Sequence, residues 1–290
     1  MPELPEVETI TRSLRQGNGA GFSILGNTIE DVSILWERSI AKPGAAEFKQ
    51  RVRGQHIQEI NRRGKYIVIV LTQDNLLIHL RMSGDLRIER GGADFLKNGL
   101  RKHDRVAFTL QGDNYLLFED ARKFGRLWLL ADPQEELGKL GPEPLGEELD
   151  AERFYTMLQG KKRQLKPLLM DQSFLAGMGN IYTDEVLFKA KLHPLTNARD
   201  LSAEQAANLL QAIRGTLQEG IARNGSSIDW VYRGGDFQNH FAVYGRTGEA
   251  CPVCGATIER LVVGQRGTHI CPHCQRLPSQ NSLNSRPVFK

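Results

Sequence analysis

Cys251-Pro-Val-Cys254 and Cys271-Pro-His-Cys274 are the stretches of this 290-residue sequence that say most about its fold. They are two Cys-x-x-Cys pairs sixteen residues apart, and the chain has no other cysteine. This spacing is typical of a zinc ribbon, in which each pair turns tightly and four thiolates bind one tetrahedral ion. We therefore predict a small β-hairpin with one structural Zn²⁺ bound by Cys251, Cys254, Cys271 and Cys274.

The competing interpretation of these cysteines is a pair of disulfides. It is disfavoured because the sequence shows no signal peptide, and disulfides persist mainly in secreted proteins. His269 and His273 could also ligate a metal, but four thiolates already complete a structural site. We expect the ribbon to present Arg266, which lies between the two pairs.

Composition and charge indicate an ordinary soluble, folded protein. It is 40% hydrophobic and 25% charged, which suits two domains plus the ribbon, and its longest aliphatic run, residues 67–71, is too short to cross a membrane. Residues 241–290 contain six Lys or Arg against two Glu, and residues 161–166 form a second basic cluster. Two such clusters suit a nucleic-acid backbone, although a charge cluster is equally often only a solvated surface.

The hydrophobic periodicity divides the chain into halves. After an opening helix, β-branched and aromatic runs indicate strands, and residues 132–146, with three prolines and three glycines, resemble a linker. Helical patterns follow, the longest opening with the capping box Ser202-Ala-Glu-Gln205 and ending at Asn224-Gly225. The expected strands cover residues 63–71, 76–81, 105–110, 115–118 and 127–130.

The opening Met1-Pro2-Glu3-Leu4-Pro5-Glu6 contains a candidate nucleophile. If Met1 is removed, as is usual before a small residue, Pro2 becomes a secondary amine that can attack a sugar aldehyde carbon and form a Schiff base. Glu3 would place a carboxyl group near the same carbon. The simpler interpretation is that Pro5 opens a helix and that the neighbouring acids are favoured by its dipole.

Gly177-Met-Gly-Asn-Ile-Tyr182 suits a tight turn that opens a helix whose amides would attract a phosphate. With it, the chain resembles bacterial formamidopyrimidine-DNA glycosylases, bifunctional enzymes that excise oxidised purines such as 8-oxoguanine. The resemblance runs from Pro2 to about Gln275. It rests on the ribbon and on six motifs: Pro2-Glu-Leu-Pro-Glu-Val-Glu-Thr9, Arg62-Arg-Gly-Lys-Tyr66, His79-Leu-Arg-Met-Ser-Gly84, Asp120-Ala-Arg-Lys-Phe-Gly125, Gly177–Tyr182 and Val243-Tyr-Gly-Arg246.

The resemblance implies an α+β fold. It predicts an N-terminal β-sandwich flanked by helices, and a C-terminal helix–two-turn–helix domain with a β-hairpin zinc ribbon. It also implies a monomer that binds double-stranded DNA containing damaged bases, in the bacterial cytoplasm and associated with the nucleoid. The boundaries expected are 1–131 for the sandwich, 132–146 for the linker, 147–240 for the helical domain, 241–278 for the ribbon and 279–290 for a disordered tail.

The resemblance also implies catalytic roles. Pro2 corresponds to the nucleophile that attacks the sugar C1′, and Glu3 to the acid that protonates the opened sugar or the leaving group. Glu6 corresponds to a supporting carboxylate. Lys65 matches the residue credited with proton transfer in β-elimination and with a phosphate contact. Arg266 matches the arginine credited with δ-elimination and with gripping phosphates, for which its planar charged fork is suited.

A glycosylase must evert the damaged base and fill the space that it leaves. Met82, Arg122 and Phe124 correspond to the filling residues, with Phe124 as an apolar wedge and Arg122 offering donors to the orphaned cytosine. Since two residues apart on an extended segment share a side, we expect Arg122 and Phe124 to point the same way. The expected phosphate contacts come from His79, His103, Lys161, Lys166, Asn180, Tyr244 and Arg266.

Two segments depart from the family pattern, and two alternative functions stay open. Residues 225–240, the expected lid over the everted base, are several residues shorter than in many relatives, which predicts a weaker preference for 8-oxoguanine over ring-opened purines. Residues 91–99 are additional sequence with no functional account. The alternatives are an endonuclease VIII-like glycosylase for oxidised pyrimidines, disfavoured by the opening motif, and a non-catalytic zinc-ribbon DNA-binding protein, which would bind without cleavage.

Overall fold

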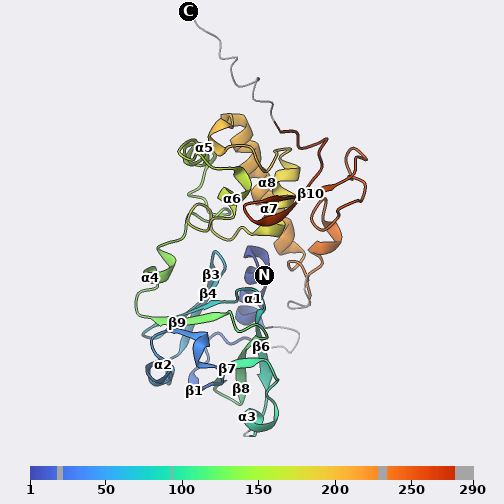
Figure 1. Ribbon diagram of the computed structural model, residues 1–290. Helices are drawn as coiled ribbons and strands as arrows, with labels where there is room; N and C mark the ends of the chain where they lie inside the picture. Colours follow the sequence, from blue (N-terminus) through green and yellow to red (C-terminus); the bar gives the residue numbers. More distant parts are fainter. Residues whose placement is uncertain (18–21, 93, 228–233, 278–290) are drawn as a thin grey trace, which may run out of the picture. The chain divides into compact units, whose positions relative to one another are not determined.

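The computed structural model describes residues 1–17, 22–92, 94–227 and 234–277 (Figure 1). The chain forms two compact units, an N-terminal unit of residues 1–140 with 219–238, and a C-terminal unit of residues 141–218 with those after 238. The described residues of 219–238 thus group with the N-terminal unit by their contacts, although the sequence predicts the helical domain over 147–240. The expected disordered tail lies outside the described residues. Among those described, no helix has the length and apolarity to cross a membrane.

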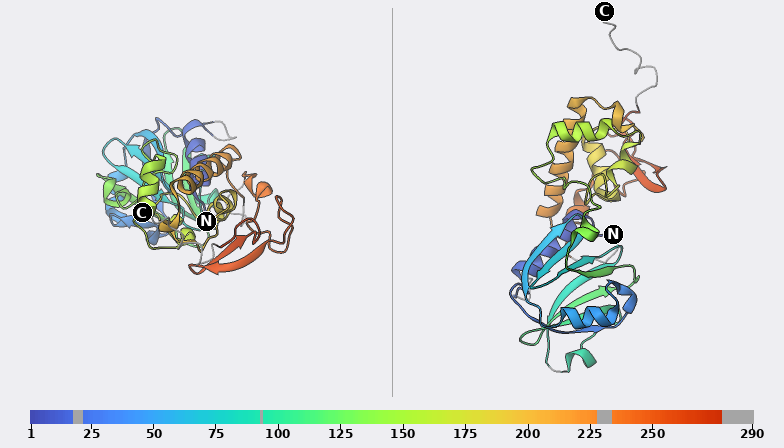
Figure 2. Two further views of the ribbon diagram at one scale, coloured as in Figure 1. Left: turned by 90° about the horizontal axis from the view of Figure 1, so that it is seen from above. Right: turned by 90° about the vertical axis from the view of Figure 1, so that its left-hand side faces the viewer.

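The N-terminal unit is built on two facing sheets (Figure 2). One has the strand order β1-β7-β8-β6 and the other β2-β9-β5-β4-β3, and all neighbours are antiparallel except β2 and β9. The expected β-sandwich is confirmed. The strands are β1 Ile29–Ile34, β2 Ile40–Lys42, β3 Ile57–Arg63, β4 Tyr66–Leu71, β5 Asn75–His79, β6 Gly84–Arg90, β7 Asp104–Leu110, β8 Asn114–Asp120 and β9 Arg126–Leu130.

The main core lies between these sheets and under two helices. Helix α1 (Leu4–Gln16) packs on β3 and β4, and α2 (Ala45–Val52) packs on β1 and β2. Strand β4 is apolar along its whole length because both faces are covered. Its Ile67 and Ile69 join the main core, whereas Tyr66 and Val68 pack on the opposite face with residues that include Leu137 of α4 (Gln134–Leu137).

Five of the nine strands of the sandwich were expected, and β6 shows why a strand with a charged outer face is missed. In β6, Asp85, Arg87 and Glu89 alternate with buried residues, so no apolar run marks the strand. The additional residues 91–99 have a structural explanation. Their short helix α3 (Phe95–Asn98) covers the outer face of the β1-β7-β8-β6 sheet, where the Phe95 ring stacks on Tyr115 with centroids 4.3 Å apart.

The described residues of the C-terminal unit form three short helices, most of the long helix α8 (Ala203–Ala222) and the predicted hairpin. Helix α8 begins in this unit with the expected capping box, since the Ser202 and Gln205 side chains each accept the other's backbone N–H at 3.1 and 3.0 Å. It ends before Asn224 and Gly225, whose φ angles are +56° and +76°. The other helices and strands of this unit are α5 Ala151–Gln159, α6 Leu165–Leu169, α7 Asn180–Lys189, β10 Glu259–Val263 and β11 Arg266–Ile270. The chain also has the 3₁₀ turns η1 Glu37–Ser39 in the N-terminal unit, η2 Ala198–Asp200, and η4 Phe237–His240.

Candidate catalytic and DNA-binding site

The start of α1 places Pro2 beside two buried carboxyl groups. Pro2 is buried, and Glu3 and Glu6 are each only 2% exposed. Glu3 is the N-cap residue, and its backbone N–H donates to Glu6 Oε2 at 2.8 Å, as in a capping box. The acidic opening therefore does form a helix start. It also fixes the backbone next to Pro2, which a positioned nucleophile requires.

Glu6 also binds the segment that follows α8 within the same unit. Its Oε1 accepts the Ser226 N–H at 2.7 Å and the Ser226 hydroxyl at 3.1 Å. A Cβ atom on Gly225 would lie 2.7 Å from the same oxygen, and the φ angle of Gly225 is +76°. Glycine is required there for conformation and for space. Glu6 thus ties the start of α1 to residues 225–226, a connection that the sequence does not reveal. The lid residues Trp230 and Tyr232 lie outside the described residues.

Lys65 lies in the tight turn that joins β3 to β4. Gly64, with φ +56°, allows the turn, and Lys65 is 4% exposed. Arg62 fixes this turn: its Nη1 donates to the Gly64 carbonyl at 3.0 Å, and its Nε donates to Glu8 of α1, also at 3.0 Å. Helix α1 and the turn that carries Lys65 are therefore held by one guanidinium.

His79 lies at the end of β5, opposite Tyr66 of β4, with ring centroids 4.7 Å apart. Burial lowers the pKa of His79 to about 3, assisted by the positive charges of Arg81 and Lys65. Its Nδ1 accepts the Arg81 backbone N–H at 3.0 Å. The imidazole is therefore neutral near pH 7 and carries its proton on Nε2. The expected phosphate contact would be a neutral hydrogen bond from that nitrogen, not an ion pair.

Met82, Arg122 and Phe124 project from two adjacent turns. Met82 and Phe124 are among the few exposed large apolar side chains of the described residues, 38% and 48% accessible. The Arg122 guanidinium lies over the Phe124 ring, 5.2 Å from its centroid. The expectation of an extended segment is wrong, since residues 121–123 form a turn and bend and Lys123 has a φ of +62°. The turn, not strand alternation, brings the arginine and the phenylalanine together.

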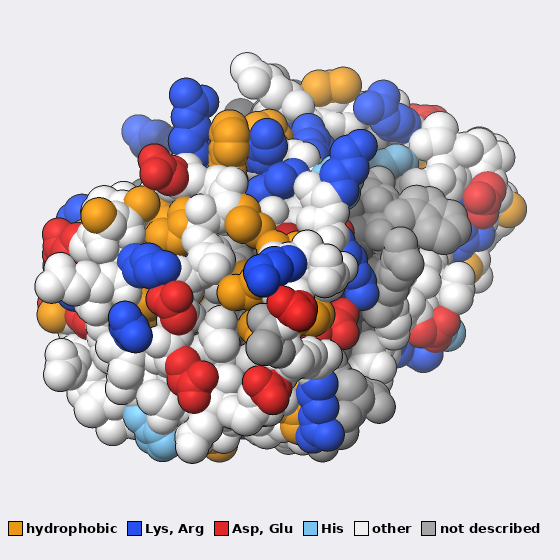
Figure 3. All heavy atoms as spheres, turned by 90° about the horizontal axis from the view of Figure 1, so that it is seen from below, with side chains coloured by type: hydrophobic (Ala, Val, Ile, Leu, Met, Phe, Trp, Pro, Cys, Tyr) orange, Lys and Arg blue, Asp and Glu red, His pale blue; other side chains and the backbone are white. Residues whose placement is uncertain are grey.

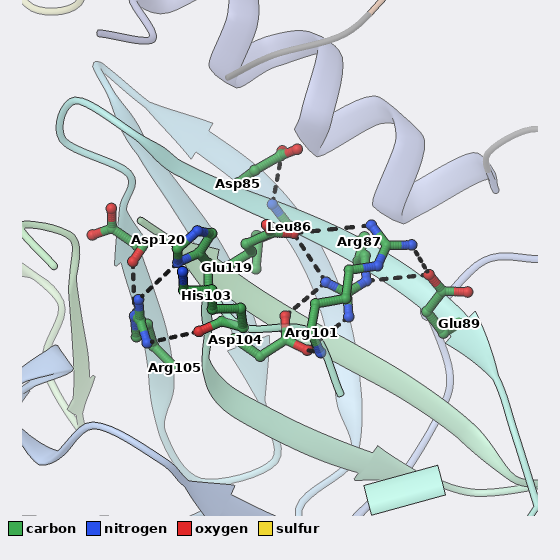
Figure 4. A network of polar contacts seen from close by, with 11 residues as sticks. Asp85, Leu86, Arg87, Glu89, Arg101, His103, Asp104, Arg105, Glu119 and Asp120 are labelled. Atoms are coloured by element: carbon green, nitrogen blue, oxygen red, sulfur yellow. Dashed lines mark hydrogen bonds and ion pairs between the residues drawn. The ribbon is translucent and has the colours of Figure 1, made fainter. Parts of the chain in front are cut away.

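His103 precedes β7 and is held beside the same turn (Figure 4). The Arg105 guanidinium lies 3.3 Å from His103 Nδ1 and donates to the Asp120 carbonyl at 2.7 Å. Further along the sheet, Arg87 makes two bonds of 2.7 Å to the buried carboxylate of Asp104. In the space-filling view from below, Lys and Arg side chains gather toward the upper edge, whereas side chains of both charges are interspersed over the rest of the view (Figure 3).

In the C-terminal unit, Arg266 is exposed at the start of β11. It pairs with Val263 across a two-residue turn, Gly264-Gln265, in which both φ angles are positive, +55° and +61°. This is the turn geometry that suits a tight hairpin. The ribbon therefore presents an arginine at its tip, as the sequence predicted.

Lys166 does not lie where a phosphate contact requires it. Its side chain is fully buried, and its Nζ binds Asp184 Oδ1 at 2.6 Å and the Gly267 carbonyl at 3.0 Å. Asn180 Nδ2 donates to the same carbonyl at 3.2 Å, and Asp184 Oδ2 accepts the His269 N–H at 2.9 Å. The expectation for Lys166 is corrected accordingly: it attaches β11 to α6 and α7. Asn180 is half-buried at the start of α7, as expected.

Tyr244 is held by a residue that the sequence did not single out. Glu185 is buried in α7 and accepts the backbone N–H groups of residues 242–244 at 2.8, 3.0 and 2.8 Å. The Tyr244 ring packs edge-on against His269 with centroids 4.9 Å apart. Lys161, another of the expected phosphate contacts, is exposed directly after α5. For Glu185, the available signal was an adjacent Asp184-Glu185 pair directly before the apolar run Val186-Leu-Phe188, since buried charges need partners.

The four cysteines come together at the base of the hairpin. Their sulfur atoms all lie within 4.8 Å of one another. All four are free, and Cys251 and Cys271 accept backbone N–H groups of residues 253 and 274 at 3.4 Å, as in two knuckles. Four convergent thiolates fit tetrahedral Zn²⁺ and complete its coordination, so the role of the metal is structural. The prediction of one zinc ion is confirmed, and the disulfide alternative is excluded.

The predicted site residues thus divide between the two units. Those in the N-terminal unit are Pro2, Glu3, Glu6, Lys65, His79, Met82, His103, Arg122 and Phe124. Those in the C-terminal unit are Lys161, Lys166, Asn180, Tyr244, Arg266 and the four cysteines.

Three family models match consecutive segments of the chain. They are the formamidopyrimidine-DNA glycosylase N-terminal domain at residues 1–127, the formamidopyrimidine-DNA glycosylase H2TH domain at residues 140–231, and the zinc finger found in FPG and IleRS at residues 248–277. A β-sandwich, a helix–two-turn–helix domain and a zinc hairpin in this order define a zinc-ribbon DNA glycosylase.

Curated proteins resemble the chain over nearly its full length. A formamidopyrimidine-DNA glycosylase of Protochlamydia amoebophila is 40% identical over 285 residues, which are 95% of this chain and 100% of the relative. One of Brevibacillus brevis is 43% identical, covering 95% and 99%. The chain belongs to the formamidopyrimidine-DNA glycosylase family.

Solved structures with DNA are similar as well. MutM in complex with DNA containing carbocyclic 8-oxo-G matches with a TM-score of 0.86 and 38% identity, covering 95% of this chain and 100% of that one. Lactococcus lactis Fpg (MutM) with DNA containing N7-benzyl-Fapy-dG matches with the same score, identity and coverage.

Proposed function

We propose that this chain is a DNA glycosylase and AP lyase of base excision repair, which removes oxidised purines from double-stranded DNA through a Schiff base on Pro2. Family membership supports the activity and its substrate class. The observation that carries the mechanism is the fixed, buried start of α1, where Pro2 lies next to Glu3 and the Glu6 carboxylate binds both the Glu3 N–H and Ser226.

In the first step, the lone pair of the Pro2 nitrogen forms a bond to the sugar C1′. The glycosidic bond breaks, its electron pair leaves with the base, and the base takes up a proton. Glu3 then donates a proton to the ring oxygen as the sugar opens, and the proline nitrogen loses its own proton to give the iminium. A secondary amine is suited to this step because its iminium carries a permanent positive charge.

The iminium makes two eliminations feasible. Loss of a proton from C2′ expels the phosphate on C3′, and loss of a proton from C4′ then expels the phosphate on C5′. Lys65 is our candidate for proton transfer in the β-elimination, because Arg62 fixes its turn to α1. The always-charged Arg266 is better suited to hold the departing phosphates than to donate a proton.

The remaining candidates bind the duplex. Met82, Arg122 and Phe124 would fill the space of the everted base, and Asn180, Tyr244, Lys161, His79 and His103 would contact phosphates, which position DNA without reading sequence. Lys166 is omitted because it is buried. We place the protein in the bacterial cytoplasm on the nucleoid, since its relatives are bacterial and its substrate is DNA.

Borohydride trapping tests this proposal. The protein is mixed with a duplex containing 8-oxoguanine opposite cytosine, and peptide mass locates the covalent adduct. We expect the adduct on Pro2. A version with a cleavable extension before Pro2, whose nitrogen is then an amide, should form none, and removal of the extension should restore it. Tight binding without an adduct, despite confirmed loss of Met1, would contradict the proposal. A parallel duplex with an oxidised pyrimidine tests the endonuclease VIII-like alternative.

A further inference from the structure

The two turns that carry the filling residues are joined by one buried side chain. The first turn spans residues 80–84 and is closed by a bond of 2.9 Å from the Gly84 N–H to the Leu80 carbonyl. The second spans residues 121–124. Both project exposed apolar groups, and neither turn is covered at its tip. Between them lies Asp120, the last residue of β8, with no exposed surface.

The Asp120 carboxylate bonds to both turns. Its Oδ1 accepts a short hydrogen bond from the hydroxyl of Ser83, the residue after Met82, and the backbone N–H of Arg122 at 3.1 Å. Its Oδ2 accepts the backbone N–H of Gly125 at 2.7 Å. The Arg122 N–H also donates to the Ser83 hydroxyl at 3.0 Å. One carboxylate therefore binds next to all three filling residues.

The surroundings leave this arrangement little freedom. A Cβ atom on Gly125 would lie 2.3 Å from Phe118 Cζ and 3.2 Å from Asp120 Oδ2, so the second turn closes directly onto the core and the carboxylate. The backbone of Asp120 is also fixed, since its N–H donates to the His103 carbonyl at 2.9 Å and its carbonyl accepts from Arg105 (Figure 4).

We propose that Asp120 is a positioning residue that holds the Met82 turn and the Arg122–Phe124 turn as one preordered unit for insertion into DNA. The inference rests on the filling roles proposed above. Its physical basis is preorganisation: two exposed turns ordered separately would each lose conformational freedom on binding, whereas turns bonded to one buried carboxylate are already ordered. The Ser83 hydroxyl is the link between the two turns.

A coupling measurement tests the link. Dissociation constants are measured for a duplex with an uncleavable abasic-site analogue opposite cytosine, using Met82→Ala, Phe124→Ala and the double variant. We expect each truncation to weaken binding about 10-fold. The fold-change of the double variant should differ by about 5-fold from the product of the two single fold-changes, the size usual for coupled neighbours. The same cycle is repeated in a Ser83→Ala background, where the deviation should vanish.

Two backgrounds serve as controls. Ser83→Thr keeps the hydroxyl and should keep the coupling. Ser173→Ala removes a similar hydroxyl bond, 2.7 Å to Asp171 in the other unit, and should also keep it. A loss of stability alone does not change the coupling, because the cycle compares the effect of one truncation on the dissociation constant with and without the other truncation in the same background. Coupling that persists in Ser83→Ala, or is absent from the wild type, would overturn the inference. If neither single truncation weakens binding, the filling roles fail first.

Discussion

Gly225→Ala gives the sharpest test of how the nucleophile is positioned. The new methyl group would lie 2.7 Å from Glu6 Oε1 and 2.8 Å from its Cγ, closer than any relaxed contact. Glu6 cannot stay where it binds both the Glu3 N–H and Ser226. Gly54 offers a matched control, because its φ of +79° is nearly the same while nothing lies within 4 Å of its Cβ position.

Both substitutions place an alanine at a positive φ angle, but only Gly225→Ala also brings a methyl group against Glu6. A left-handed alanine costs about 1–2 kcal/mol, offset by about 0.4–1 kcal/mol from the stiffer unfolded chain, so Gly54→Ala should lower the free energy of unfolding by about 1 kcal/mol. At Gly225, two hydrogen bonds from Ser226 to a carboxylate are lost as well, each worth about 1.5–3 kcal/mol. We expect a total loss of about 4–7 kcal/mol.

Activity separates the variants further. A displacement of about 1 Å at the start of α1 costs roughly 100-fold in rate when the geometry of attack matters. We therefore expect borohydride trapping on 8-oxoguanine DNA to slow about 100-fold in Gly225→Ala and to stay near wild type in Gly54→Ala. Denaturant unfolding and single-turnover trapping of both full-length variants measure these effects. Equal behaviour of the two variants would refute the positioning role of the Glu6 contact.

Three further perturbations have defined outcomes. The His79 pKa of about 3 lies below its ordinary value near 6.5, so its stabilising contribution is present above pH 6.5 and is lost as pH falls towards 3. Between pH 7 and pH 4.5, the free energy of unfolding should therefore fall by about 3 kcal/mol less in His79→Phe than in the wild type, as measured by denaturant unfolding. Chelation of zinc should unfold the hairpin and weaken DNA binding as much as Arg266→Ala does, as measured by fluorescence anisotropy titration. Chelation should cause no further loss of DNA affinity in Arg266→Ala, but the whole loss in the exposed control Arg276→Ala. Lys166→Met removes the ion-pair partner of the buried Asp184 carboxylate, which among the described residues keeps only its bonds to His269. Unfolding should therefore show a loss of about 3–5 kcal/mol, against less than about 0.5 kcal/mol for exposed Lys161→Met.

Local signals were enough to predict the elements whose ends are marked by side chains. The Ser202 and Gln205 pair begins α8 and the Asn224-Gly225 pair follows its end, as their chemistry requires. The cysteine spacing likewise specifies the ribbon, because the geometry of four thiolates around one ion is independent of the rest of the chain. The strands β3 and β6 were missed because their outward residues are polar or charged, so neither strand shows an apolar run.

The site was predictable only where residues face solvent or belong to a family motif. Lys166 shows the limit. In sequence it is one more cation in a basic cluster, and only the folded chain places Asp184 and the Gly267 carbonyl around it. Whether Lys166 is buried depends on the residues that surround it in the fold, and its two partners lie 18 and 101 residues away in the sequence. A charge count along the chain does not distinguish it from exposed Lys161.

The residues that hold the site share a chemistry that conceals them in the sequence. Glu6, Asp120 and Glu185 are buried carboxylates, and each accepts backbone N–H groups from a segment that carries a functional side chain. A backbone donor is present in every residue except proline, so the partner segment has no residue type that reveals the bond. Removing such a carboxylate leaves several buried donors unsatisfied, whereas truncating an exposed residue such as Phe124 leaves none. The carboxylates should therefore dominate stability and the exposed groups DNA binding, which is why neither measurement alone identifies the whole site.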